Sequence, residues 1–159
     1  YKSQRLYRDA RIFSIYEGTT QLQVVAAIRY ISNGTMLQNI KEMLEDVKEK
    51  VANGGRSSAL LARIEKLIPV YEETLNHAKE LGSQDAFDFL ARRLYDMTAE
   101  LVMSLLIVRD ADKAPEMFGK SAEVYVRMAE EDVLGKAAYI KAFTPEDIVN
   151  FRVAEAETE

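Results

Sequence analysis

The sequence contains no cysteine, a single histidine, three prolines and seven glycines in 159 residues. Without cysteine, the chain can form neither a disulfide framework nor a thiolate metal site. The small numbers of proline and glycine leave long uninterrupted segments, and such segments favour helices.

Two further absences narrow the class of protein. The formal net charge of −5 argues against a nucleic-acid partner, because no basic face could dominate the contacts with phosphate. No apolar run reaches transmembrane length, and the longest, at residues 101–108, is interrupted by Ser104, so we expect no membrane insertion. A hydrophobic content of 48% with 30% charged residues is typical of a folded, soluble chain that can bury a core.

Four long segments carry apolar residues at helical spacing, and turn signals separate them. The segments lie at residues 36–51, 60–78, 85–109 and 118–140. The segment 85–109 is apolar on more than one side, which predicts a helix in the centre of a bundle. Amphipathic helices joined by short loops predict an all-α fold, an antiparallel up-down four-helix bundle.

Local signals predict where these helices begin, end and bend. Gly34 and Gly82 are expected to end helices, and Ser83 to cap the next one. Pro69 is expected to kink its helix or to leave one carbonyl unpaired. We also expect a turn at residues 110–115, and a short last helix with Thr144 as N-cap and Pro145 at its first position.

The N-terminal segment predicts two helices that meet at a corner. Residues 7–15 have a helical pattern, Gly18 interrupts it, and Thr20 with Gln23 reads as a capping box for a second helix. Glu17 therefore sits beside a helix N-terminus with unsatisfied N–H groups. From the residues alone, such a glutamate is most often a surface acid that complements the helix dipole.

The same segment resembles the C-terminal signature of flavin-dependent acyl-CoA dehydrogenases. The matching residues are Tyr-Arg-Asp-Ala-Arg-Ile at 7–12, Ile-Tyr-Glu-Gly-Thr at 15–19 and Gln-Leu-Gln at 21–23. The resemblance implies that Glu17 is the catalytic base, that Tyr16 and Gly18 contact the acyl-CoA substrate, and that the cofactor FAD is contacted by Thr19, Thr20 and Gln21. Arg8 and Asp9 belong to the signature, and an ion pair that holds the corner accounts for them.

The resemblance also implies a division of the chain. Residues 1–34 are expected to end the helical domain of the enzyme, and residues 35–159 to form a bundle like the helical extension of some bacterial members. We therefore expect a C-terminal fragment that is inactive by itself. The complete enzyme is expected to convert an acyl-CoA to the 2,3-enoyl-CoA as a cytoplasmic homo-oligomer, with electron-transferring flavoprotein as its partner.

Two other interpretations stay open from the sequence, and a third, a metal site, does not fit it. The bundle could serve only structure or oligomerisation, and the same site could belong to an acyl-CoA oxidase. A di-iron centre needs Glu-x-x-His pairs. The single histidine, His77, has Thr74 three residues before it, so this pair does not form. Glu73 and His77 lie one turn apart, which favours a salt-bridged surface over a pair of metal ligands, and we predict no metal site.

Overall fold

The computed structural model describes residues 2–15, 19–51 and 55–149, and seven helices account for nearly all of these residues. In chain order the helices are α1 (Lys2–Ile15), α2 (Thr19–Ser32), α3 (Thr35–Lys50), α4 (Arg56–Glu80), α5 (Gln84–Lys113), α6 (Pro115–Ala142) and α7 (Pro145–Val149). These ranges contain no strand, so the all-α prediction is confirmed. No helix among them is both long enough and apolar enough to span a bilayer.

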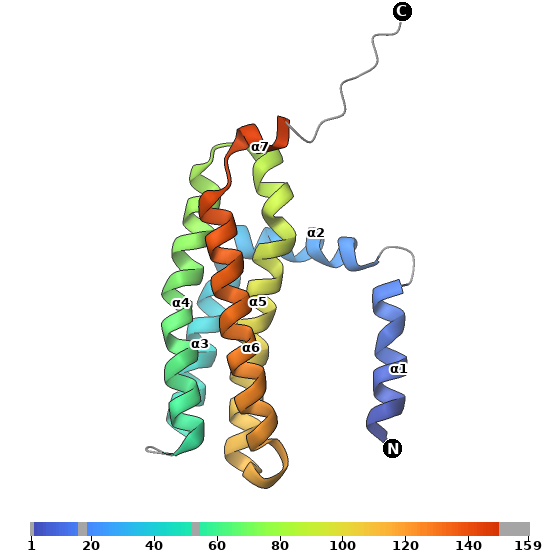
Figure 1. The fold of residues 1–159 in the computed structure, drawn as a ribbon, viewed down its shortest axis with the longest axis vertical. Helices are drawn as coiled ribbons and strands as arrows, with labels where there is room; N and C mark the ends of the chain where they lie inside the picture. The colour runs from blue at the N-terminus through green and yellow to red at the C-terminus, as the bar shows by residue number, and fades with distance from the viewer. Residues whose placement is uncertain (1, 16–18, 52–54, 150–159) are drawn as a thin grey trace, which may run out of the picture.

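Helices α3 to α6 lie side by side and run alternately up and down, as Figure 1 shows. This is the predicted antiparallel bundle. Helix α2 crosses it and packs against α3 and α5, while α1 stands away from the bundle. The predicted division at residues 34 and 35 falls between α2 and α3, although Ile31 of α2 packs into the same core as the bundle.

Helix α5 lies at the centre of this arrangement and contacts α2, α3, α4, α6 and α7. Its pattern of apolar residues on several sides explains this position, because each side meets a different helix. Six large side chains of α5 are 0–1% exposed, namely Leu90, Leu94, Met97, Leu101, Leu105 and Val108. Full burial of such a side chain contributes about 1.5–3 kcal/mol, so this row is a major source of stability.

One polar pair is enclosed in the core between α4 and α5. The Tyr71 hydroxyl lies 2.7 Å from Thr98 Oγ1, and Tyr71 is 0% exposed. Thr98 Oγ1 also donates to the carbonyl of Leu94 at 2.8 Å. Because the threonine proton is used in that bond, the tyrosine donates and the threonine accepts. The pair fixes how α4 lies against α5 without leaving a buried hydroxyl unsatisfied.

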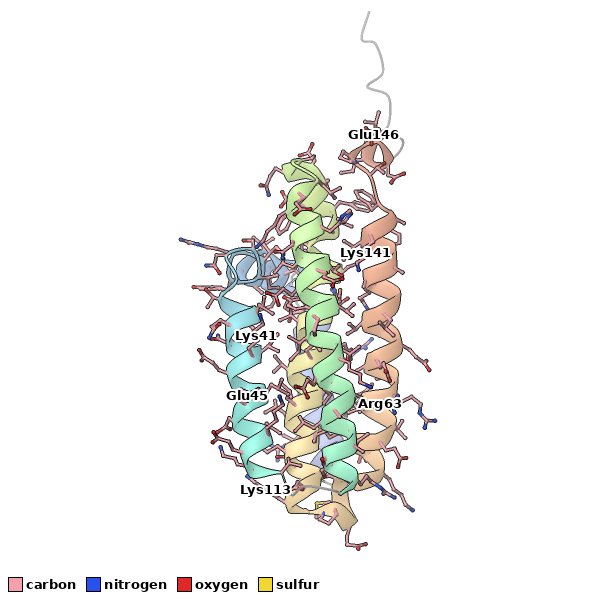
Figure 2. The ribbon with its side chains drawn as sticks, turned by 90° about the vertical axis from the view of Figure 1, so that its left-hand side faces the viewer. Lys41, Glu45, Arg63, Lys113, Lys141 and Glu146 are labelled. Atoms are coloured by element: carbon pink, nitrogen blue, oxygen red, sulfur yellow. The ribbon has the colours of Figure 1, made fainter. Side chains whose placement is uncertain are left out.

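Interhelical ion pairs lie on the outside of the bundle, where Figure 2 shows the side chains of the labelled lysines. Exposed pairs of this kind each contribute about 0–1 kcal/mol, so they adjust the packing but do not determine it. The pairs that connect α4 to its neighbours are Lys41–Glu72 at 2.7 Å, Lys48–Glu65 at 2.6 Å, Lys141–Glu73 at 3.1 Å, Arg56–Glu123 at 3.9 Å, and Arg63–Glu130.

The predicted helix ends are largely as expected. Gly34 and Gly82 follow α2 and α4 with φ of 86° and 64°, in the left-handed region that glycine adopts without strain. Ser83 caps α5, since its hydroxyl accepts a bond from the Ala86 N–H at 3.2 Å. Helix α7 begins at Pro145 as predicted. There, the Asp147 carboxylate accepts the Thr144 N–H at 2.8 Å.

Two local predictions need correction. The turn expected at residues 110–115 shortens to Ala114, because α5 continues to Lys113 and Pro115 opens α6. Pro115 has no N–H to lose at a first helical position, so the second helix can start directly. Helix α4 is continuous through Pro69, which has no N–H to offer the carbonyl one turn earlier, in keeping with the expected unpaired carbonyl. Helix α2 begins at Thr19, which places Thr20 inside the first turn and not at the N-cap.

The Tyr71–Thr98 pair yields a stability prediction. Thr98→Val leaves the buried tyrosine hydroxyl without an acceptor and should cost about 1–3 kcal/mol, whereas Tyr71→Phe removes one bond and should cost about 0.5–1.5 kcal/mol. The double variant should lose less than the sum of the two. Urea unfolding measures all three.

The matched control is Thr74→Val. Thr74 is also buried, but its hydroxyl serves only the Val70 carbonyl of its own helix, so its removal strands no other side chain. An equal loss from Thr74→Val and Thr98→Val would contradict this account of the pair.

Candidate functional site

The structure places the predicted corner between α1, which ends at Ile15, and α2, which begins at Thr19. The two predicted helices are therefore present. Three of the predicted site residues, Tyr16, Glu17 and Gly18, lie outside the described residues. Of the others, Thr19 and Thr20 lie in the first turn of α2, and the side chain of Gln21 is exposed. The three predicted FAD contacts thus share one helix N-terminus.

The start of α2 carries partial positive charge. The first N–H groups of a helix have no partner inside it, and the helix dipole places partial positive charge there. No acidic residue occupies the first turn of α2. Such an end can bind an anionic group without competition from a nearby carboxylate of the same turn.

Within α1, the predicted ion pair between Arg8 and Asp9 needs correction. Asp9 lies 3.8 Å from Arg5, one turn earlier on α1, and both side chains are largely exposed. The carboxylate therefore supports α1 itself, and no contact with Arg8 is required.

Helices α1 and α2 also expose large apolar side chains. Ile31 of α2 packs into the bundle core, but other residues of the two helices point into solvent. The exposed set consists of Leu6, Tyr7, Leu22, Val25 and Tyr30, each at least 54% exposed. An apolar surface of this kind marks a site of interaction with another protein surface.

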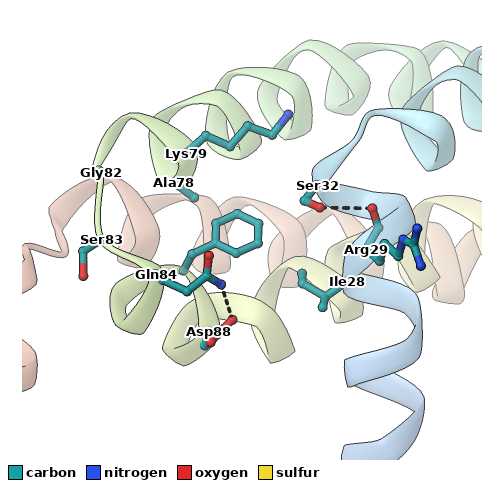
Figure 3. A pocket seen from close by; sticks show the side chains of 10 residues that line it. Ile28, Arg29, Ser32, Ala78, Lys79, Gly82, Ser83, Gln84 and Asp88 are labelled. Carbon is teal, nitrogen blue, oxygen red and sulfur yellow. Dashed lines mark hydrogen bonds between the residues drawn. The ribbon is translucent and has the colours of Figure 1, made fainter.

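A cleft lies at the other end of α2. Figure 3 shows it between the last turns of α2 and α4 and the start of α5. It has a volume of about 610 Å³. Exposed Arg29 and Lys79 stand at its edge, and Gln84 donates a hydrogen bond to Asp88 at 2.8 Å. Apolar lining comes from Ile28, Ala78 and Phe87.

This cleft was not predicted, since its basic residues are fifty positions apart in the sequence and only packing brings them together. Helix α2 has 14 residues and is therefore about 21 Å long, so the cleft is separate from the predicted corner. The cleft combines an apolar wall with cationic groups, which suits binding more than proton transfer.

A buried polar group that the sequence analysis missed lies between α5 and α6. The Glu100 carboxylate lies beside the Tyr125 hydroxyl, and its Oε2 has no hydrogen-bond partner in the described part of the chain. Burial raises the pKa of the Tyr125 phenol well above its usual range, and the negative charge of Glu100 raises it further. The pair is packed side by side within the bundle, and we assign it a structural role.

The neighbourhood of His77 is also structural. Glu73 pairs with Lys141 of α6 at 3.1 Å and not with the histidine, while the Thr74 hydroxyl donates to the Val70 carbonyl at 2.7 Å. Within residues 2–15, 19–51 and 55–149, no three His, Asp or Glu side chains gather as a metal site would require.

Comparison with known protein families gives a match over most of the chain. A family model described as "Acyl-CoA dehydrogenase C terminal" matches residues 32–148. The matched region starts at the end of α2 and includes the whole bundle. The corner residues 16–21 precede it.

A solved structure matches as well. It is the crystal structure of the acyl-CoA dehydrogenase family protein from Porphyromonas gingivalis, with 30% sequence identity and a TM-score of 0.67. The match covers 76% of this chain and 99% of that one, so the solved chain is about as long as the matched part. No curated protein matches the sequence.

The surroundings of Tyr125 and Tyr71 predict that the fold loses stability at alkaline pH. Burial raises the pKa of both phenols above the usual value near 10, so the folded chain keeps protons that the unfolded chain releases. The contribution of these two tyrosines to the free energy of unfolding should be fully present below about pH 10 and should decrease as the pH rises further. Urea unfolding between pH 8 and 11 measures the decline, which Tyr125→Phe should make shallower.

Two further variants complete this test. Glu100→Gln removes the charge beside Tyr125 and should also reduce the decline. Tyr30→Phe, which changes an exposed tyrosine on α2, is the matched control. A decline that is the same in Tyr125→Phe and wild type would contradict the assignment.

Proposed function

Because this chain belongs to the acyl-CoA dehydrogenase family, we propose that it supplies the catalytic base of an enzyme that oxidises an acyl-CoA thioester to the 2,3-enoyl-CoA. The observation that carries the proposal is the helix–corner–helix at α1 and α2, with the sequence Ile-Tyr-Glu-Gly-Thr at 15–19. Glu17, whose position in the sequence is between α1 and α2, is the proposed base.

The chemistry requires a carboxylate that removes the proton from the α-carbon of the thioester. A glutamate in water has a pKa of about 4.3 and is a weak base for a carbon acid. Enclosure by an apolar acyl chain raises that pKa, and hydrogen bonds to the thioester oxygen acidify the α-carbon. Gly18 permits a close approach of the substrate to the main chain, and Tyr16 lines the acyl pocket in this proposal.

The start of α2 suits the cofactor. Thr19, Thr20 and Gln21 lie in one helical turn that lacks an acidic residue, where free N–H groups favour an anionic ligand such as the diphosphate of FAD. When bound, FAD accepts the hydride that leaves the β-carbon. The residues of this chain orient the cofactor and hold the base.

The exposed apolar side chains of α1 and α2 also support the proposal. Leu6, Tyr7, Leu22 and Val25 need cover that the bundle does not provide. In the proposed enzyme, other parts of the protein cover these faces and complete the flavin pocket.

We further propose that the enzyme is a homo-oligomer in the cytoplasm and that it passes electrons to electron-transferring flavoprotein. An acyl-CoA oxidase would differ by passing the electrons to oxygen.

Glu17→Gln in the complete enzyme tests the base. The amide cannot accept the α-proton, so turnover should fall by about 10²–10⁴-fold while FAD and acyl-CoA still bind. Steady-state assays with an artificial electron acceptor, with and without oxygen, measure turnover and distinguish dehydrogenase from oxidase. Anaerobic bleaching of the flavin by acyl-CoA isolates the chemical step.

Asp9→Asn is the matched control, since it removes an exposed carboxylate of α1 that pairs only with Arg5 among the described residues. It should keep normal turnover. Near-normal dehydrogenation by Glu17→Gln would assign the base to another residue.

The isolated 159-residue chain should bind FAD weakly and show no activity, because Thr19 to Gln21 form only one edge of a flavin pocket. Titration with FAD, followed by flavin fluorescence and gel filtration, measures binding. A stoichiometric yellow complex from this chain alone would overturn the expectation.

A further inference from the structure

The outward side of α6 is unusually apolar. The inward side packs on α4 and α5 through buried residues such as Val126 and Val133. On the opposite side Met117, Val124 and Met128 are 73%, 69% and 52% exposed. The exposed side of an amphipathic helix is normally polar, so this stripe needs an explanation. Figure 2 shows α6 at one edge of the bundle, with its outer side directed away from the other helices.

The stripe widens onto α5 and forms a shallow groove. Met103 of α5 is 48% exposed. Ile107 lines a groove of about 410 Å³ together with Val124, Tyr125 and Met128 of α6. The groove follows the line between α5 and α6, which is the shape that receives another helix.

The two halves of the stripe differ in size. With 3.6 residues per turn, the residues that share the outer side in the first half of α6 are large, namely Met117, Val124 and Met128. In the second half the residues that continue the stripe are small, namely Gly135, Ala138 and Ala142, and all three are exposed. The large exposed side chains of this half, Leu134 and Tyr139, lie to either side of that line. A helix of this design is complementary to itself in the antiparallel direction, since large residues then face small ones.

Two charged residues of the outer side are also complementary between antiparallel copies. Glu131 lies within the stripe, and Arg127 lies one turn before it on the flank. Both side chains are exposed, and neither makes an ion pair with the other described residues. An antiparallel copy that places residue 128 opposite residue 131 also brings each Arg127 beside the Glu131 of the second copy. The same register sets Val124 against Gly135 and Met117 against Ala142.

We propose that two copies of this chain associate through an antiparallel contact between their α6 helices. Helix α6 has 28 residues and is about 42 Å long, so contact along it, with Met103 and Ile107 at the margin, can form a specific interface. The self-complementary sizes and charges favour a second copy over an unrelated partner. The inference gives the homo-oligomer an interface and does not rest on the proposed chemistry.

Sedimentation velocity of the 159-residue chain over a wide concentration range tests the proposal. Wild type should form a dimer, and Val124→Glu should weaken it by at least tenfold (an order-of-magnitude estimate), because each copy would bury an unpaired carboxylate against the apolar stripe of the other. Val25→Glu is the matched control, since Val25 is also an exposed valine but lies on α2. A monomer at all concentrations, or a dimer lost only in Val25→Glu, would overturn the proposal.

The register is tested by charge reversal. Arg127→Glu and Glu131→Arg should each weaken the dimer severalfold, as expected for an exposed ion pair, and the double variant should recover wild-type affinity. Circular dichroism shows that each variant stays folded. Failure of the double variant to recover the affinity would reject this register.

The absence of cysteine permits a direct test of direction. Met128→Cys lies near the proposed two-fold axis and should be joined to its own counterpart by a short bis-maleimide. Met117→Cys should not be cross-linked to its counterpart, because the two sulfur positions would be about 37 Å apart along the helices. Equal cross-linking of both variants would indicate a parallel contact and would overturn the proposal.

Discussion

The burial of α5 between five other helices is the constraint on which the rest of the structure depends. A 30-residue helix that carries large apolar side chains on several sides cannot remain in water, and α4 and α6 cover most of it. This explains why the loops can be short and why Ala114 alone joins α5 to α6. It also explains the Tyr71–Thr98 bond, because a polar group enclosed by that packing must find its partner within the core.

Helix α2 connects this core to the candidate site. Ile31 anchors it against the bundle, whereas its first turn carries Thr19, Thr20 and Gln21 toward the corner. The proposed FAD contacts are therefore held by the same apolar packing that stabilises the bundle. The cleft at the opposite end of α2 belongs to the bundle, since α4, α5 and the turn between them supply most of its lining.

Two apolar faces remain exposed once the core is formed, and they differ in character. The face on α1 and α2 is built from large residues such as Tyr7 and Leu22 and adjoins the corner, so it fits cover by the remainder of an enzyme. The outer stripe of α6 combines large and small halves with charges of both signs, so it fits a second copy of itself. The bundle can thus stabilise an assembly without taking part in the chemistry.

The sequence by itself determined the all-α class, four bundle helices and the glycine and serine signals at their ends, because helical periodicity and caps are local properties. It also predicted the corner around Glu17, where the assignment of roles came from family resemblance. Only the tertiary structure decided that α5 runs on to Lys113, that Glu73 pairs with Lys141, and that Arg29 meets Lys79 at one cleft. The ion pair and the cleft join residues far apart in the chain, and all three features depend on how whole helices pack, which no local pattern records.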